Sequence, residues 1–278
     1  DPRIIDAHVH FWDPDGFSTP WLERVPGLNK RHMPSEYAEA TAGLPVRALV
    51  FVECTRDEGL REARRVAELS LKDERIQAIV AWAPLEKGEA VRDDLRHLAM
   101  VPRVKGVRRL IEFESAPDFC TRPAFLQGLR ALRDFHLSFD VCITHGQLPM
   151  ATEMVRACPD VSFILDHIAK PDIRSGLREP WRTNIRKLAA QENVVCKMSG
   201  LVTEAGPGWT REQLEPYFDT VIDCFGADRV IYGGDWPMVR LAAEYDQWFE
   251  ALQWLVRGMT ALERRKLFHD NAKKVYRL

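Results

Sequence analysis

The 278-residue chain lacks the features of several large protein classes. Its charges nearly cancel, with a formal net charge of −2 at pH 7, so we expect no nucleic-acid partner and no polybasic membrane contact. It has no apolar stretch long enough to cross a bilayer, and we see no signal-peptide pattern. No internal repeat or low-complexity linker divides the chain, and we expect a single domain over residues 1–278.

Two short motifs are also missing. The six cysteines are scattered without a C-x-x-C pair, and several lie in apolar runs, where cysteine behaves as a small hydrophobe. This usage predicts reduced thiols and a cytoplasmic enzyme rather than a disulfide framework. No G-x-G-x-x-G phosphate loop follows the first apolar run, which counts against a dinucleotide-binding sheet.

Apolar, β-branched runs alternate with longer amphipathic stretches. Such alternation is typical of a parallel sheet with helical crossovers. Eight strands in this length fit an α/β protein with a (β/α)8 TIM barrel, and an open doubly wound sheet is the main alternative. The expected strands are 4–8, 47–53, 76–81, 105–110, 139–144, 162–166, 194–198 and 230–232. The expected helices are 57–72, 122–135, 148–157, 180–191, 211–225 and 242–256.

Histidine and aspartate side chains follow several of these strands. His8 and His10 lie two residues apart at the end of the first strand, so their side chains point to the same side. Two converging imidazoles suit a divalent metal. His145 follows the fifth strand, His167 ends the sixth and Asp235 follows the eighth. The carboxyl ends of barrel strands meet at one mouth, where we expect these five residues to be neighbours.

Two irregular segments are expected on the same face as this mouth. Residues 11–34 form a long stretch after the first strand that contains Trp12 and Trp21, and it is placed to wall or cover the site. Residues 201–210, with Gly206, Pro207 and Gly208, are expected to form a loop after the seventh strand.

Four ordered motifs resemble the amidohydrolase superfamily, and within it the sugar-lactone and 2-pyrone-4,6-dicarboxylate lactonases of the L-fuconolactonase and L-rhamnonolactonase type. The motifs are DAHVHFWD at 6–13, LDHIAKP at 165–171, KMSGL at 197–201 and GDWP at 234–237, and Asn271-Ala272 before Tyr276 also matches that branch. The resemblance spans nearly the whole chain. It implies a barrel in which Asp235 activates water, with the strand-one histidines and His167 in or near a metal site.

The fourth strand departs from the metal-paired members of the superfamily. Those members place a carboxylated lysine at its end, whereas this chain has Val-Arg-Arg-Leu at 107–110 and Lys105 lies too early. A bridged two-metal centre is therefore not expected. The resemblance implies one divalent metal, zinc, held by a set of four residues, and it leaves open whether that metal is required. The set is His8, His10, His167 and Asp235.

The expected reaction opens a sugar lactone, such as L-fucono- or L-rhamnono-lactone, to the aldonic acid. Asp235 takes a proton from a water that attacks the ring carbonyl, and a metal or the imidazoles stabilise the oxyanion. His167 and His145 complete the catalytic set. Three alternatives stay open: a 2-pyrone-4,6-dicarboxylate-type lactonase, a metal-dependent decarboxylase of the same superfamily, and a non-catalytic sugar-binding barrel. The partner is a small-molecule lactone, and the sequence does not predict the oligomeric state.

Seven further residues are candidates for substrate contact. Neighbours on a strand alternate sides, so only one of Arg108 and Arg109 should enter the mouth, and we favour Arg109. Such an arginine can orient sugar oxygens or bind the forming carboxylate. The others are Lys170 and Glu53 as hydrogen-bonding groups, Trp82 and Trp12 as walls, and Trp236 beside Asp235.

Overall fold

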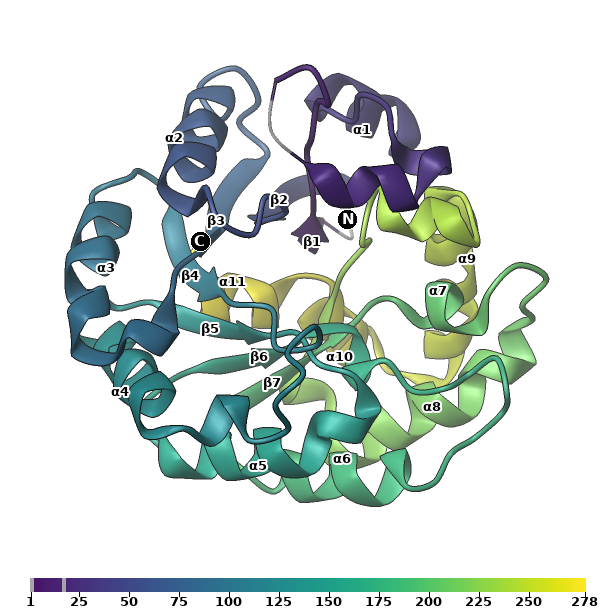
Figure 1. Ribbon diagram of the computed structural model, residues 1–278. Coiled ribbons are helices and arrows are strands. Elements are labelled where there is room, and N and C mark those ends of the chain that lie inside the picture. The colour runs from purple at the N-terminus through teal and green to yellow at the C-terminus, as the bar shows by residue number, and fades with distance from the viewer. Residues whose placement is uncertain (1–2, 17–18) are drawn as a thin grey trace.

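The computed structural model describes residues 3–16 and 19–278 and contains a parallel sheet of eight strands. Each strand pairs with the next one along the chain. The strands form an inner ring surrounded by helices (Figure 1), so the fold is the predicted (β/α)8 barrel of a single domain. The strands are β1 (Ile4–Val9), β2 (Val46–Val52), β3 (Ile76–Trp82), β4 (Val104–Arg108), β5 (Ser138–Val141), β6 (Phe163–Leu165), β7 (Val194–Met198) and β8 (Val230–Tyr232).

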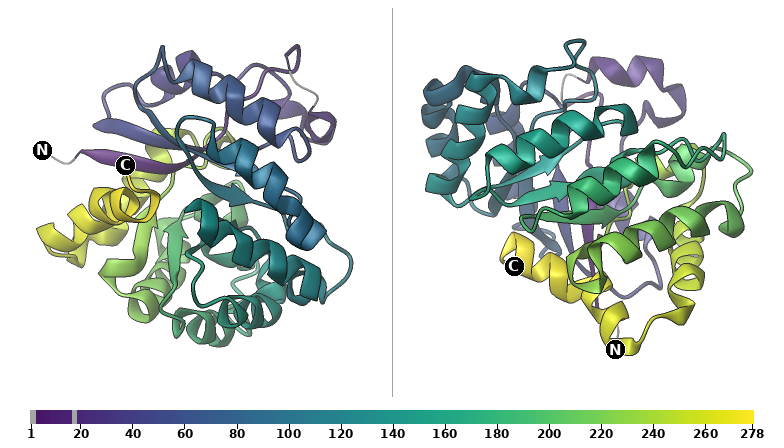
Figure 2. Two further views of the ribbon diagram at one scale, coloured as in Figure 1. Left: turned by 90° about the vertical axis from the view of Figure 1, so that its left-hand side faces the viewer. Right: turned by 90° about the horizontal axis from the view of Figure 1, so that it is seen from below.

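The α-helices lie around the barrel and, in the case of the last one, across one end of it (Figure 2). They are α1 (Pro34–Ala40), α2 (Gly59–Leu69), α3 (Arg92–Ala99), α4 (Pro123–Ala131), α5 (Leu148–Ala157), α6 (Trp181–Ala189), α7 (Leu201–Ala205), α8 (Arg211–Phe225), α9 (Tyr245–Leu255), α10 (Ala261–Arg265) and α11 (Asn271–Tyr276). The prediction of a loop over 201–210 was wrong at its start, because α7 buries Leu201, Val202 and Ala205.

The barrel interior is apolar at the end where the strands begin. Alternate residues of the strands point inward there and pack against Ala272 and Tyr276 of α11. Figure 2 shows α11 at the end of the barrel from which β1 starts. The inward-facing apolar strand residues are Ile5, Ala7, Val50, Val52, Ala78, Val80, Ile164 and Ile231. The helix thus covers one end of the barrel, and the carboxyl ends of the strands form the mouth at the other.

The barrel closes between β8 and β1 through a short seam. Val9 forms an isolated parallel bridge with Trp236, and the His10 amide donates to the Trp236 carbonyl at 2.8 Å. The Asp6 carboxylate accepts from the amides of His8 at 3.1 Å and Gly234 at 2.7 Å. The start of β1 is therefore tied to the segment that carries Asp235.

The segment 11–34 lies against the mouth, although its residues 17–18 fall outside the described ranges. It contains two short 3-10 helices, η1 (Pro20–Arg24) and η2 (Pro26–Leu28). The Trp21 indole donates to the Cys54 carbonyl at 2.9 Å, which fixes the segment to the loop after β2. All six cysteines lie in the described ranges and are unpaired, and none of the helices described there is long and apolar enough to span a membrane.

Candidate active site

A bulge in β1 points two histidines into the mouth. Asp6 pairs with Leu49 and Val9 pairs with Phe51, so β1 has one residue more than β2 between these positions. Asp6 faces outward, where its carboxylate accepts from the hydroxyls of Tyr37 and Tyr245. The two imidazoles face inward, with His8 Nε2 3.1 Å from His10 Nε2. The imidazoles of His8 and His10 thus converge as expected, but on a bulged strand rather than on a regular one.

Asp235 follows β8 and faces both of these rings. Its amide donates to the His8 carbonyl at 2.8 Å, and its Oδ1 lies 3.8 Å from Nε2 of each of His8 and His10. This buried Oδ1 has no hydrogen-bond partner among the described residues. Burial raises the pKa of Asp235 to about 8, while the Lys170 charge lowers it. A carboxylate with a pKa of about 8 and one oxygen that accepts no hydrogen bond from the described residues is suited to act as a general base.

His167 belongs to an unusual left-handed turn. Its φ is 51°, and φ of Ile168, Ala169 and Lys170 is 49°, 63° and 48°. Each such non-glycine residue costs roughly 1–2 kcal/mol, so other contacts must hold the turn. The Trp181 indole donates to the Ile168 carbonyl at 2.8 Å, and His167 Nδ1 lies 2.8 Å from Ser199 Oγ. The turn places His167 Nδ1 3.8 Å from Asp235 Oδ2.

His145, proposed from the sequence as a catalytic residue, is placed beside this turn. It begins the 3-10 helix η6 (His145–Gln147) after β5 and is half-buried. Its Nδ1 lies 2.9 Å from the Lys170 carbonyl oxygen. The contact supports the strained backbone, and a direct catalytic role for His145 stays a prediction.

Arg108, rather than Arg109, enters the barrel. Arg108 is buried, and it donates from Nε to Glu53 Oε1 at 2.8 Å and from Nη1 to Asp166 Oδ2 at 3.3 Å. Arg109 points to the rim, where it pairs with Glu86 and Glu114. The preference for Arg109 was therefore wrong, because the face of β4 that turns inward is the one that holds Arg108.

The other expected substrate contacts are largely occupied by protein groups. Glu53 is held by Arg108, and Lys170 pairs with Glu112 near the mouth. Trp12 and Trp236 are each 1% exposed, so they pack within the protein rather than line open space. Trp82 is half-buried and lines a groove shared by α2 and α3.

The barrel interior contains a buried charge cluster that the sequence reasoning did not identify. Lys197 of β7 contacts Asp140 of β5, and its Nζ lies 3.0 Å from Asp166 Oδ1 and 3.1 Å from His8 Nδ1. The Tyr276 hydroxyl donates to Asp140 at 2.8 Å. Burial would raise the pKa of Asp166, but Lys197 and His8 hold it well below its usual value. A lysine in an otherwise apolar strand was the available signal.

The residues around Asp235 fit a divalent metal. One ligand atom from each of His8, His167 and Asp235 lies within 4.8 Å of the others. Burial lowers the pKa of both histidines well below the usual value, which leaves neutral imidazoles for coordination. The orphaned Asp235 Oδ1 is a further sign that a ligand belongs here. His10 lies beside this triad, and burial lowers its pKa to about 3.

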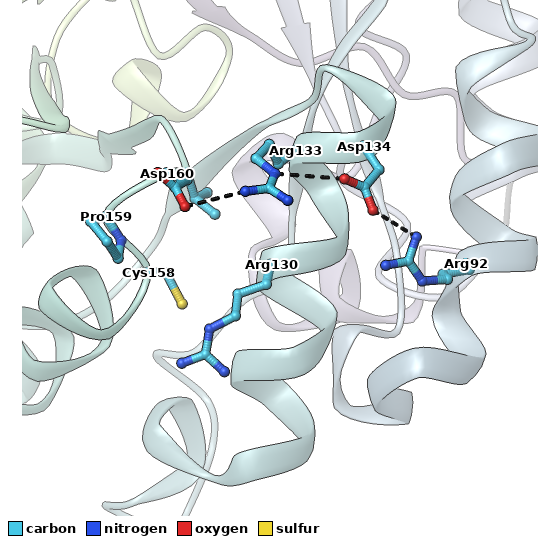
Figure 3. A pocket seen from close by; sticks show the side chains of 8 residues that line it. Arg92, Arg130, Arg133, Asp134, Cys158, Pro159 and Asp160 are labelled. Atoms are coloured by element: carbon cyan, nitrogen blue, oxygen red, sulfur yellow. Dashed lines mark hydrogen bonds and ion pairs between the residues drawn. The ribbon is translucent and has the colours of Figure 1, made fainter.

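A second concave surface lies at the opposite end of the barrel. Figure 3 shows its arginines, which come from α3, α4 and the segment just before β5. Arg92 pairs with Asp134 at 2.8 Å, Arg133 with Asp160 at 3.3 Å, and Arg130 donates to the Ala157 carbonyl at 3.0 Å. Since these cations already have acceptors, the groove is a weaker candidate than the mouth.

Several known proteins resemble this chain over nearly its whole length. A family model described as Amidohydrolase matches residues 5–278. An L-fucono-1,5-lactonase of Burkholderia ambifaria is 32% identical over 99% of this chain and 95% of its own length. Another, from Burkholderia multivorans, is 29% identical over 99% of this chain and 96% of its own length. The crystal structure of an amidohydrolase from Burkholderia multivorans with bound zinc has a TM-score of 0.90 and 27% identity, with 99% of each chain covered.

Proposed function

This chain belongs to the amidohydrolase family of hydrolases, and we propose that it opens a sugar lactone to the corresponding aldonic acid. The single observation that carries the proposal is the buried Asp235 carboxylate, with its bare Oδ1 facing His8 and His10 at the mouth. The relatives named L-fucono-1,5-lactonase support the choice of a lactone.

Asp235 acts as the general base in this proposal. It accepts a proton from a water molecule while the water oxygen attacks the lactone carbonyl carbon. Negative charge develops on the carbonyl oxygen, and the imidazoles of His8 and His167, which lie beside Asp235, are placed to stabilise it. The ring C–O bond then breaks, and Asp235 returns the proton to the leaving alkoxide.

His8, His167 and Asp235 are the residues that would hold a divalent metal, with His10 alongside. Zinc suits a set of imidazole and carboxylate donors. When bound, the metal supplies Lewis-acid polarisation of a carbonyl and makes water more acidic. With a metal bound, Asp235 would serve both as a ligand and as the group that accepts the proton from water.

The charges around the mouth favour a neutral polyol lactone over a dicarboxylated pyrone. Arg108 is neutralised by Glu53 and Asp166, and Lys170 by Glu112. Arg109 is likewise paired with two rim glutamates. A substrate with two carboxylates would have to break such pairs, whereas hydroxyl groups can share them.

A panel of aldonolactones with a pH-indicator readout tests the proposal. Each lactone is assayed with and without chelator, and the enzyme-free rate is subtracted because lactones open spontaneously. We expect acid release from at least one neutral aldonolactone and slower release from 2-pyrone-4,6-dicarboxylate. No release from any lactone, together with carbon dioxide release from an aromatic acid, would show a decarboxylase instead.

A further inference from the structure

The hydrogen on His10 is fixed by its partner. His10 Nδ1 lies 2.8 Å from the Val52 carbonyl oxygen, which can only accept. A neutral His10 therefore has its hydrogen on Nδ1 and a bare Nε2. That bare nitrogen is the one that faces His8 Nε2 at 3.1 Å.

The hydrogen on His8 is fixed from the opposite side. The Lys197 ammonium can only donate, and its Nζ lies 3.1 Å from His8 Nδ1. A bare Nδ1 places the hydrogen of neutral His8 on Nε2, from which it donates to His10. The contacts then form one chain of donors that runs from Lys197 through His8 and His10 to Val52.

Metal coordination requires a different arrangement of His8. His8 Nε2, the nitrogen nearest to Asp235, can bind a cation only when it is bare, so the hydrogen must lie on Nδ1. Metal-bound histidines usually donate their other N–H to a carboxylate or carbonyl. The Asp166 Oδ1 lies 3.4 Å from His8 Nδ1 and can accept it, but Lys197 is closer to the same nitrogen.

We propose that Lys197 is a positioning residue that holds His8 with its hydrogen on Nε2 and thereby weakens metal binding at the mouth. Binding of a metal moves that hydrogen to Nδ1, where Asp166 accepts it, and Lys197 loses its contact with the ring. The buried positive charge of Lys197 also repels a cation at the mouth, which lowers the metal affinity further. This proposal does not depend on lactone hydrolysis, because it concerns the free protein and its metal affinity.

Removal of Lys197 alone would leave Asp140 and Asp166 with less compensation in the interior, which endangers folding. The test variant is therefore the double substitution Asp140→Asn with Lys197→Met, which removes one charge of each sign. Asp166 keeps Arg108 as a partner, and the Tyr276 hydroxyl can donate to the amide oxygen that Asp140→Asn introduces. The matched control is Asp140→Asn alone, which retains the lysine.

Zinc affinity is measured by competition with a chromophoric chelator on metal-depleted proteins. We expect Asp140→Asn, which removes a negative charge beside Lys197, to bind zinc no more tightly than wild type. The double variant should bind zinc about 10–100-fold more tightly than that control, a change of the size that groups around metal ligands produce in affinity. A purely structural role for Lys197 would weaken binding rather than strengthen it. Equal affinity of the double variant and the Asp140→Asn control, or weaker binding by the double variant, would overturn the proposal.

The hydrogen position is read directly by 15N NMR of histidine-labelled protein, with the His8 signals assigned by their loss in His8→Gln. In metal-depleted wild type we expect the hydrogen of His8 on Nε2, and on Nδ1 after zinc is added. A wild-type spectrum with the hydrogen already on Nδ1 before zinc addition contradicts the proposal, even if the variants do not fold.

Discussion

The amide nitrogen of Asp235 donates to the carbonyl oxygen of His8 at 2.8 Å across the seam between β8 and β1. This bond joins the first and last strands of the barrel at the point where each delivers a side chain to the mouth. The distances from Asp235 Oδ1 to the two imidazoles therefore depend on how firmly the seam is closed.

Asp6 is expected to be the main support of that seam. Its carboxylate accepts four hydrogen bonds, from the amides of His8 and Gly234 and from the hydroxyls of Tyr37 and Tyr245. Asp6→Ala leaves buried donors unpaired, and we expect a loss of about 3 kcal/mol in the free energy of unfolding by urea denaturation. Tyr37→Phe removes only one donor and should cost about 1 kcal/mol. Equal losses for the two variants would contradict this role.

Arg108 and Arg109 are adjacent, so they form a matched pair. Arg108→Met leaves Glu53 and Asp166 buried without their cation, and we expect a loss of about 3–5 kcal/mol in the free energy of unfolding. Arg109→Met removes pairs at the partly exposed rim, which should cost roughly 1 kcal/mol or less. Urea denaturation of both variants checks the order, and the reverse order would show that Arg109 is the internal residue.

Gly200 is expected to tolerate no side chain. Its φ is 74°, and a Cβ on it would lie 2.8 Å from the Cβ of His167. Gly200→Ala should push His167 from its place beside Asp235 and lower kcat for the lactone more than it raises KM. The strained backbone alone should cost roughly 1–2 kcal/mol of stability. Gly146→Ala is the control and should retain its activity, because a Cβ there would meet no atom of the described residues within 4 Å.

The pH dependence follows from the protonation of Asp235. A protonated carboxyl cannot accept a proton from water, and burial raises the pKa of Asp235 to about 8. In metal-depleted protein kcat/KM should therefore rise as the pH rises through about 8 and fall on the acid side. A bound cation favours the carboxylate and should move this limb to lower pH.

Lys170→Met provides the check on that profile, because the Lys170 charge lowers the pKa of Asp235. Its loss should move the limb to higher pH, whereas Lys187→Met on the outer helix α6 should leave it in place. A kcat/KM that stays flat across this range in metal-depleted protein would assign the base to another group.

The alternation of apolar strands and amphipathic helices favoured the barrel but left an open doubly wound sheet as the alternative, which the ladder from β1 to β8 and the bridge between Val9 and Trp236 exclude. The bounds of β7 and β8 match the expectation, because each is a short apolar run with clear flanks. The inward-facing arginine could not be predicted, because alternation says that Arg108 and Arg109 face opposite sides without saying which side is inside. Gly106 lies two residues before Arg108 and therefore on the same face of β4. That face is the inner one, because Gly106 packs against Val80 and Ser138 so closely that a Cβ on it would lie 2.6 Å from Ser138 Oγ.

The left-handed turn at His167 could not be predicted from the residues that form it. Ile168 is β-branched and disfavours positive φ, so its own preference opposes the observed φ of 49°. Contacts from Trp181 and His145, which are distant in the sequence, override that preference. Lys197 stands out in an apolar strand, but its contacts could not be predicted, because only the closed barrel brings Asp140, Asp166 and His8 around it.

The most direct test of the account is the turnover of Asp235→Asn on a neutral aldonolactone, with product binding measured on the same protein. The substitution keeps the shape of the side chain and removes its ability to accept a proton. We predict that kcat falls by about 10²–10⁴-fold while aldonic acid still binds, and that Asp223→Asn on the exposed face of α8 behaves as wild type. Turnover of Asp235→Asn within tenfold of wild type, with binding unchanged, would contradict the assignment of Asp235 as the base.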